Sequence, residues 1–125
     1  MIPIDQTRFG EGNGNCFNAC LASIMELPID HFPPYWKWGN EWLAEYNSFL
    51  RKHHGLQLLV LLPNVDLWQD GGGFLQSYHV ISGTSSRGIA HSVVGLNGEM
   101  VHDPHPDRTG LEKANYWEFL IKTFK

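Results

Sequence analysis

Residues 12–27 read GNGNCFNACLASIMEL, and this stretch organises the rest of the chain. Its first three residues are turn formers, and Asn15, which follows them, is a residue type that caps helices. The apolar residues after the turn recur with the helical period: Phe17, Cys20, Leu21 and Ile24. We therefore expect a buried helix that begins at Cys16 and is stopped by Pro28.

Cys16 falls on the first turn of this expected helix, at the rim of its apolar face. The positive end of the helix dipole and the unpaired N–H groups there would lower the pKa of a thiol and offer a donor to an oxyanion. This position favours a nucleophile, although a buried structural cysteine remains the alternative. Cys20 lies inside the apolar face and is expected in the core.

Composition limits the class of protein. The 125 residues suit a single domain spanning 1–125, and the formal net charge of −4, with no basic run, argues against a nucleic-acid partner. The start, MIPIDQTRFGEG, is not a signal peptide, and no apolar run approaches the length of a membrane span. Two cysteines four residues apart form neither a disulfide framework nor a zinc motif. We expect a soluble, cytoplasmic protein with free thiols and no membrane association.

The order of the other expected elements indicates an α+β fold. Asn40 is expected to cap a second helix that runs to about His54 and ends at Gly55. LQLLVLL from Leu56 reads as a strand buried on both faces, and residues 67–75, with three consecutive glycines, as a loop. Further strands are expected at 77–82, 89–96 and 99–103, with a strand or short helix at 116–124. Helices thus come first and strands later.

One expected hairpin carries the residues of a catalytic dyad. His91 opens one strand, and Asp103 ends the next. A two-residue turn at Asn97-Gly98 would turn Asp103 to the other face of the sheet. A three-residue loop, 96–98, would place His91 opposite Asp103. We therefore predict the three-residue loop, with a positive φ at Gly98 and a hydrogen bond between imidazole and carboxylate.

The motifs together resemble a known family. Gln6, GNCFNACLASIMELP around the cysteine, HSVVGLNG and VHDPHP follow one another in the order found in the papain-like fold, specifically its peptidase C39-like branch of small bacterial and phage proteins. The resemblance spans about Gln6 to Pro106. It implies a nucleophile helix packed on an antiparallel sheet, with Cys16 as nucleophile, His91 as base and acid, and Asp103 as the residue that orients His91.

The resemblance also implies that Gln6 and the backbone N–H of Cys16 form the oxyanion hole. Gln6 lies ten residues before Cys16, an interval longer than is usual in the family. The amide of Asn13 or Asn15 is therefore the alternative donor. Arg87 and Trp38 are further candidates for contact with a substrate.

These residues predict a cysteine-dependent hydrolase that cleaves an amide, peptide or isopeptide bond of a peptide or protein substrate through a covalent acyl-enzyme. Acyl transfer by the same triad and a non-catalytic binding or inhibitory module are the alternatives. A metal site built from His102, Asp103 and His105 is a third, but strand alternation turns His102 away from Asp103. We therefore expect no metal and no cofactor.

Overall fold

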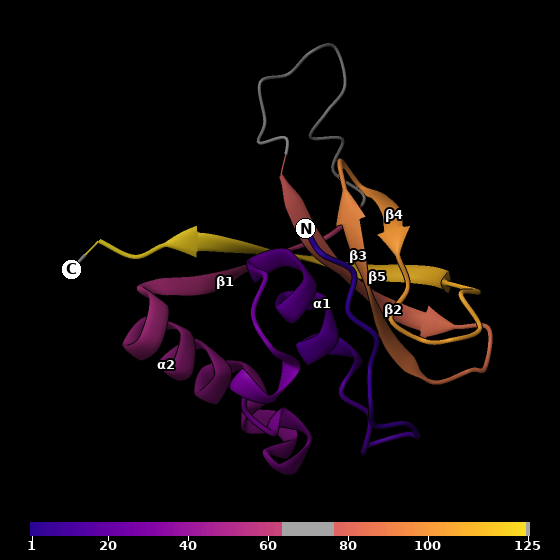
Figure 1. Cartoon of the computed structure of the whole chain (residues 1–125), viewed down its shortest axis with the longest axis horizontal. Helices are drawn as coiled ribbons and strands as arrows, with labels where there is room; N and C mark the ends of the chain where they lie inside the picture. Colours follow the sequence, from indigo (N-terminus) through magenta and orange to yellow (C-terminus); the bar gives the residue numbers. More distant parts are fainter. Residues whose placement is uncertain (64–76, 125) are drawn as a thin grey trace.

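The computed structural model describes residues 1–63 and 77–124, and within them two helices pack on an antiparallel sheet (Figure 1). The helices are α1 (Cys16–Met25) and α2 (Trp42–His54). The strands are β1 (Leu56–Leu61), β2 (Tyr78–Ser85), β3 (Ala90–Leu96), β4 (Glu99–His102) and β5 (Leu111–Lys122), in the spatial order β1-β5-β2-β3-β4. Three 3₁₀ turns join α1 to α2: η1 (Ile29–His31), η2 (Tyr35–Lys37) and η3 (Gly39–Glu41). The α+β prediction is confirmed at this level.

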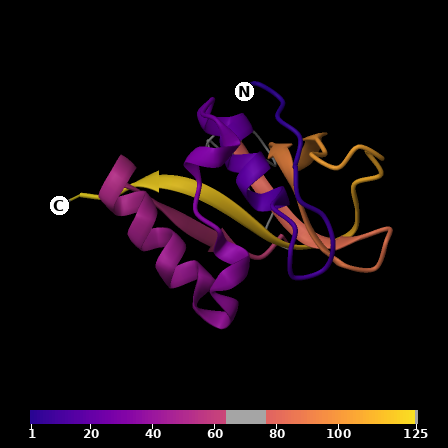
Figure 2. The same ribbon diagram turned by 60° about the horizontal axis from the view of Figure 1, so that its bottom comes forward.

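The sheet has buried residues on both faces. The helices share one face, where α1 crosses β2 and β3 and α2 lies by β1, as Figure 2 shows from below. The core on this face includes Phe17, Leu21, Tyr46, Leu50, Leu58, Val80 and Val94. The second core cluster consists of Ile81, Val93, Trp117 and Phe119. Strand alternation separates the two sets, because Val80 and Ile81, or Val93 and Val94, are sequence neighbours. The predicted loop at 67–75 lies outside the described residues.

Helix α1 begins at Cys16 as predicted, but Asn15 does not cap it with its side chain. The Oδ1 atom of Asn15 instead accepts hydrogen bonds from the backbone N–H groups of Thr7 and Arg8, at 3.0 and 2.9 Å. The amide thus fixes the N-terminal segment against the start of the helix. At the other end, Glu26 adopts a left-handed conformation with φ 57°, and the helix ends before Pro28 is reached.

Helix α2 starts at Trp42, so the prediction that Asn40 caps it is wrong. The residues before it, Gly39–Glu41, form the 3₁₀ turn η3, so the α-helix begins only after this turn. Its end is as predicted, because Gly55 takes a left-handed φ of 64° and its N–H bonds back to the last turn.

Strand β1 lies at the edge of the sheet and pairs only with β5 among the described strands. Leu59 and Val60 are more than one third exposed. The prediction that this apolar run is buried on both faces is therefore wrong. The closing segment is a strand rather than a helix, and β5 begins earlier than expected, at Leu111.

The turn between β3 and β4 has two residues, so the predicted three-residue loop at 96–98 is wrong. Leu96 pairs with Glu99, and Asn97 and Gly98 both have positive φ, 54° and 82°. These values are typical of a type I′ turn, the commonest connection in tight hairpins. The predicted positive φ at Gly98 is confirmed.

A bulge in β4 nevertheless brings the dyad together. Val94 pairs with His102, one residue further along β4 than the register at the turn would give, so Val101 is the extra residue. The insertion changes which face the following residues occupy. Asp103 therefore reaches the side of His91, and the predicted hydrogen bond exists, with His91 Nε2 2.7 Å from Asp103 Oδ1.

Neither α1 nor α2, the helices of the described ranges, offers an apolar stretch long enough to cross a bilayer.

Candidate active site

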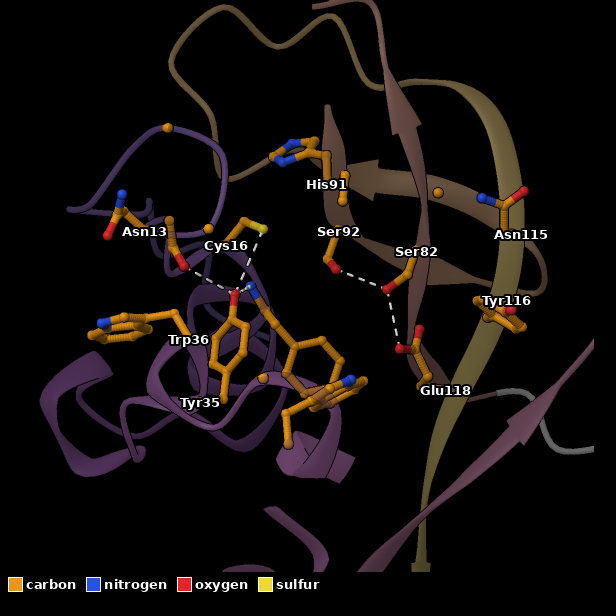
Figure 3. Close-up of a pocket in the computed structure, with 18 residues that line it drawn as sticks. Asn13, Cys16, Tyr35, Trp36, Ser82, His91, Ser92, Asn115, Tyr116 and Glu118 are labelled. Carbon is orange, nitrogen blue, oxygen red and sulfur yellow. Dashed lines mark hydrogen bonds between the residues drawn. The ribbon is translucent and has the colours of Figure 1, made fainter. Parts of the chain in front are cut away.

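A cavity of about 400 Å³ opens between the start of α1 and the sheet (Figure 3). Its walls come from the glycine-rich loop at 10–14, from η2 and the start of α2, and from β2, β3 and β5. Aromatic side chains line much of it: Phe17, Tyr35, Trp36, Trp42 and Tyr116. Its volume lies within the range of sites that bind small molecules or side chains of a larger partner.

Cys16 lines this cavity from the first turn of α1, and its thiol points toward β3 (Figure 3). Its Sγ lies 4.0 Å from the hydroxyl oxygen of Tyr35. That hydroxyl accepts a hydrogen bond from the Phe17 N–H at 3.3 Å and donates one to the Gly14 carbonyl at 3.1 Å. Tyr35 therefore ties the glycine-rich loop to the helix start and fixes the position of the cysteine between them.

The pKa of the Cys16 thiol is raised, contrary to the expectation from the helix terminus. Burial raises this pKa, and hydrogen bonds from the Ser92 backbone, the Tyr35 hydroxyl and the Phe17 backbone oppose it only in part. Cys20 is fully buried in the core, as predicted, and burial raises its pKa further. Of the two thiols, Cys16 is the one that borders the cavity.

His91 and Asp103 form a buried pair at the start of β3. Burial acts to raise the pKa of the Asp103 carboxyl, but the hydrogen bonds from His91 and from the backbone N–H groups of His105 and Gly110 outweigh it and hold the pKa below its ordinary value. Burial lowers the pKa of His91, and Asp103 offsets this only in part. The resting pair is therefore a neutral imidazole beside a carboxylate.

The imidazole of His91 and the thiol of Cys16 line the same cavity from opposite walls (Figure 3). Among the described residues no hydrogen bond joins them. Because Asp103 occupies Nε2, the ring nitrogen that remains for the thiol is Nδ1. Distances between catalytic groups are often longer without substrate, so this geometry is compatible with a dyad.

The three candidate oxyanion donors occupy different positions. Gln6 is buried outside the cavity wall, and its Nε2 donates to the Arg8 carbonyl at 2.9 Å. The amide of Asn15 is already used, since its Nδ2 donates to the Thr7 hydroxyl and its Oδ1 accepts two backbone N–H groups. Asn13 lines the cavity on the glycine-rich loop.

The two candidate substrate contacts lie away from the cavity. Arg87, in the loop between β2 and β3, forms an ion pair with Asp107. Trp38 packs against the core on the helix side of the sheet. Trp36 and Trp42 take the place expected of Trp38, and both line the cavity.

The three residues of the alternative metal site, His102, Asp103 and His105, each contact a different partner. His102 Nε2 lies 3.0 Å from the Ile4 carbonyl, whereas Asp103 faces His91, in agreement with the predicted alternation. His105 lies beside Asp107. Within residues 1–63 and 77–124 no three His, Cys, Asp or Glu side chains are grouped to hold a metal ion.

Sequence reasoning missed a buried carboxyl in the cavity. Glu118 of β5 is 4% exposed, and its Oε2 accepts a hydrogen bond from Ser82 Oγ at 3.1 Å. Ser82 Oγ lies 2.8 Å from Ser92 Oγ, so a hydrogen-bonded chain runs from Glu118 toward the thiol (Figure 3). Burial raises the pKa of Glu118 to about 8. The available signal was an acidic residue in the apolar run WEFLI, residues 117–121.

Comparisons of the chain with protein-family models, with curated proteins and with solved structures found no match. The resemblance to the papain-like fold therefore stays a prediction that rests on the motifs quoted above. The case for a function is carried by the geometry of the site.

Proposed function

We propose that the chain is a cysteine-dependent hydrolase that cleaves an amide, peptide or isopeptide bond on a minimal papain-like fold. The observation that carries the proposal is that His91, hydrogen-bonded to the buried Asp103, lines the same cavity as Cys16 at the start of α1. Thiol, imidazole and carboxylate on three separate elements are the groups that covalent acyl transfer requires.

In the proposed reaction, Nδ1 of His91 takes the proton of the Cys16 thiol as Sγ attacks the carbonyl carbon of the substrate. The carbonyl π electrons move to oxygen, and the N–H of Cys16 donates to the resulting oxyanion. The imidazolium, held by Asp103, then protonates the leaving amine as the C–N bond breaks. Water attacks the thioester with His91 as base, and the acid product and the thiol are released.

The raised pKa of Cys16 and the lowered pKa of His91 mean that thiol and imidazole are both neutral at rest. His91 therefore acts as a general base during attack, rather than as one half of a preformed ion pair. Acylation is expected to fall on acidification, with a midpoint below the ordinary histidine pKa of 6.5.

A non-catalytic binding module is the second candidate function. It is favoured by one observation: the groups beside the thiol are Tyr35 and Ser92, and no hydrogen bond links it to His91 in the described residues. A module of this kind would use the same cavity without acylation.

Acylation by p-nitrophenyl acetate distinguishes the two candidates. A hydrolase should release a burst of p-nitrophenolate, and mass spectrometry should find the acetyl group on Cys16. Cys16→Ala should abolish the burst, whereas Cys20→Ala should retain it. A Cys16→Ala variant that keeps the burst, or a wild-type protein without one, would favour the binding module.

The side-chain oxyanion donor is tested by Gln6→Ala, with Asn13→Ala as its matched variant. If the Gln6 amide donates to the oxyanion, its removal should lower the acylation rate by about 10²-fold, as removal of other such donors does. Circular dichroism checks that the fold is kept. A loss of only a few-fold for Gln6→Ala, with a larger loss for Asn13→Ala, would assign the role to the loop.

A further inference from the structure

Glu118 presents an unsatisfied carboxyl oxygen at the cavity wall. Its Oε2 accepts from Ser82, but its Oε1 is buried without a hydrogen-bond partner among the described residues. Figure 3 shows this side chain reaching from β5 toward Ser82 on the cavity side of the sheet. A buried polar atom without a partner costs about 1–3 kcal/mol, and more when it is charged. Because Glu118 lines the cavity, a ligand bound there can supply the missing donor.

The surroundings of Glu118 determine the charge of that ligand. The described residues that line the cavity include no lysine and no arginine. The other ionisable side chains that line the cavity are Cys16 of α1, Tyr35 of η2, His91 of β3 and Tyr116 of β5, while Cys20 and Tyr46 lie in the core on the same face of the sheet. None of them carries a fixed positive charge, so a ligand has to bring one.

The aromatic wall also suits a cation on an apolar stem. Phe17, Trp42 and Tyr116 line the cavity with Glu118, and aromatic faces attract ammonium and guanidinium groups. This wall already binds a cation elsewhere, since the guanidinium of Arg8 stacks over Trp36, 4.6 Å from the ring centroid.

We propose that Glu118 forms a subsite for an ammonium or guanidinium group of the substrate, of the kind carried by a lysine or arginine side chain. The subsite lies beyond Ser92 and Ser82 as seen from Cys16, because these two hydroxyls link the thiol side of the cavity to the carboxyl. The inference rests on the proposed function, because the subsite selects a substrate only if the chain is a hydrolase. The binding of the cation itself does not depend on catalysis.

Ionisation of Glu118 provides a signature of this binding. With a pKa of about 8, the free carboxyl is mostly protonated at pH 7. A bound cation favours the carboxylate and therefore expels the proton to the buffer. Binding at pH 7 should release close to one proton, a value that calorimetry in two buffers of different ionisation enthalpy measures directly.

The test uses the full chain with Cys16→Ala, so that no acylation can occur, and two probes: N-acetyl-lysine amide and N-acetyl-norleucine amide, which lacks the ammonium group. NMR titration should show the lysine probe binding at least about tenfold more tightly than the norleucine probe, since hydrogen bonds to charged groups have this strength. Adding Glu118→Gln should remove the difference and the proton release. Adding Glu112→Gln, the same change at an exposed position of β5, should preserve both.

Equal binding of the two probes to Cys16→Ala, or a preference that survives Glu118→Gln, would overturn the subsite. If Glu118→Gln does not fold, the probe comparison and the proton release in Cys16→Ala still decide. A failed subsite leaves the acetylation of Cys16 unaffected. Conversely, lysine-selective binding by a protein whose wild type shows no burst would retain the subsite and remove the hydrolase.

Discussion

Asp103 and Glu118 are two carboxyls with nearly the same burial and opposite ionisation. Their exposed fractions are 2% and 4%, yet the pKa of Asp103 is lowered and that of Glu118 is raised to about 8. Both oxygens of Asp103 are hydrogen-bonded, to His91, His105 and Gly110, whereas one oxygen of Glu118 has no partner among the described residues.

Burial acts to raise the pKa of both carboxyls, and only Asp103 has enough hydrogen-bond donors to reverse this effect and stay charged at neutral pH. The two environments also suit different tasks. A carboxylate that is fully bonded can orient His91 and stabilise an imidazolium. A neutral acid with a free oxygen is suited to exchange its proton for a cation.

The largest effect is expected from removing the charge of Asp103. Asp103→Asn leaves the side chain nearly the same size but deprives the imidazolium of its partner. The burst rate with p-nitrophenyl acetate should fall by about 10⁴-fold, as it does when a triad loses its orienting carboxylate. Glu118→Gln should change the rate by no more than a few-fold, because acetate carries no cation. Equal losses in both variants would show that the two carboxyls share one role.

The next largest effect is on the pH dependence of folding stability, and it arises from Glu118 alone. In the unfolded chain this carboxyl ionises near the ordinary glutamate pKa of 4.5, but in the folded protein it holds its proton up to about pH 8. Its contribution to stability is therefore fully present below pH 4.5 and is lost as the pH rises toward 8. The loss amounts to about 5 kcal/mol at most.

Glu118→Gln should remove this loss, so the variant should gain stability over the wild type as the pH rises from about 5 to about 8. Urea unfolding at both pH values measures the difference. The opposite sign applies to Asp103, whose lowered pKa stabilises the fold above the unfolded value and loses that effect in acid. A Glu118→Gln variant with no such gain would mean that the carboxyl is ionised in the folded protein.

The two carboxyls also differ in how well the sequence predicted them. Asp103 was found because a strand ending in Asp-Pro faces a strand that opens with His91, and hairpins pair neighbouring segments. Another local signal, the turn residues followed by the helical apolar period, placed Cys16 at the start of a helix. Glu118 could not be found in this way, because it reaches the cavity only through the pairing of β5 between β1 and β2, which joins segments distant in the sequence. Its neighbours in the cavity depend on the whole sheet.

The prediction of the hairpin register failed for a different reason. The local preference of Asn97-Gly98 for a two-residue turn prevailed, and the bulge at Val101 corrected the alternation. A bulge adds one unpaired residue to a strand and leaves no strong signal in the residue pattern. The dyad could thus be predicted, while the means by which the hairpin forms it could not.

The smallest of the expected effects concerns the turn at Asn97-Gly98, which joins β3 to β4 and so helps to position Asp103. Gly98 has φ 82°, and its N–H donates to His79 Nε2 at 3.1 Å. Valine is strongly disfavoured at this φ, because its branched side chain clashes with the backbone. Gly98→Val should therefore cost about 1–3 kcal/mol of stability in thermal unfolding. It should also slow acylation, because a strained turn shifts the register that positions Asp103.

Gly98→Asn is the matched control, since asparagine tolerates a left-handed backbone and should retain most of the stability and rate. The two variants together show how far the position of Asp103 depends on the turn and how far on the bulge. If Gly98→Val loses stability but acetylates Cys16 at the wild-type rate, the bulge at Val101 alone maintains the position of Asp103. Deletion of Val101 should remove the bulge but keep Val94 opposite His102 and Asp103 on the side of His91, so this variant should acetylate Cys16 at close to the wild-type rate. Val101 is 45% exposed, so its deletion should cost little packing, and a large loss of rate would mean that the bulge itself positions Asp103.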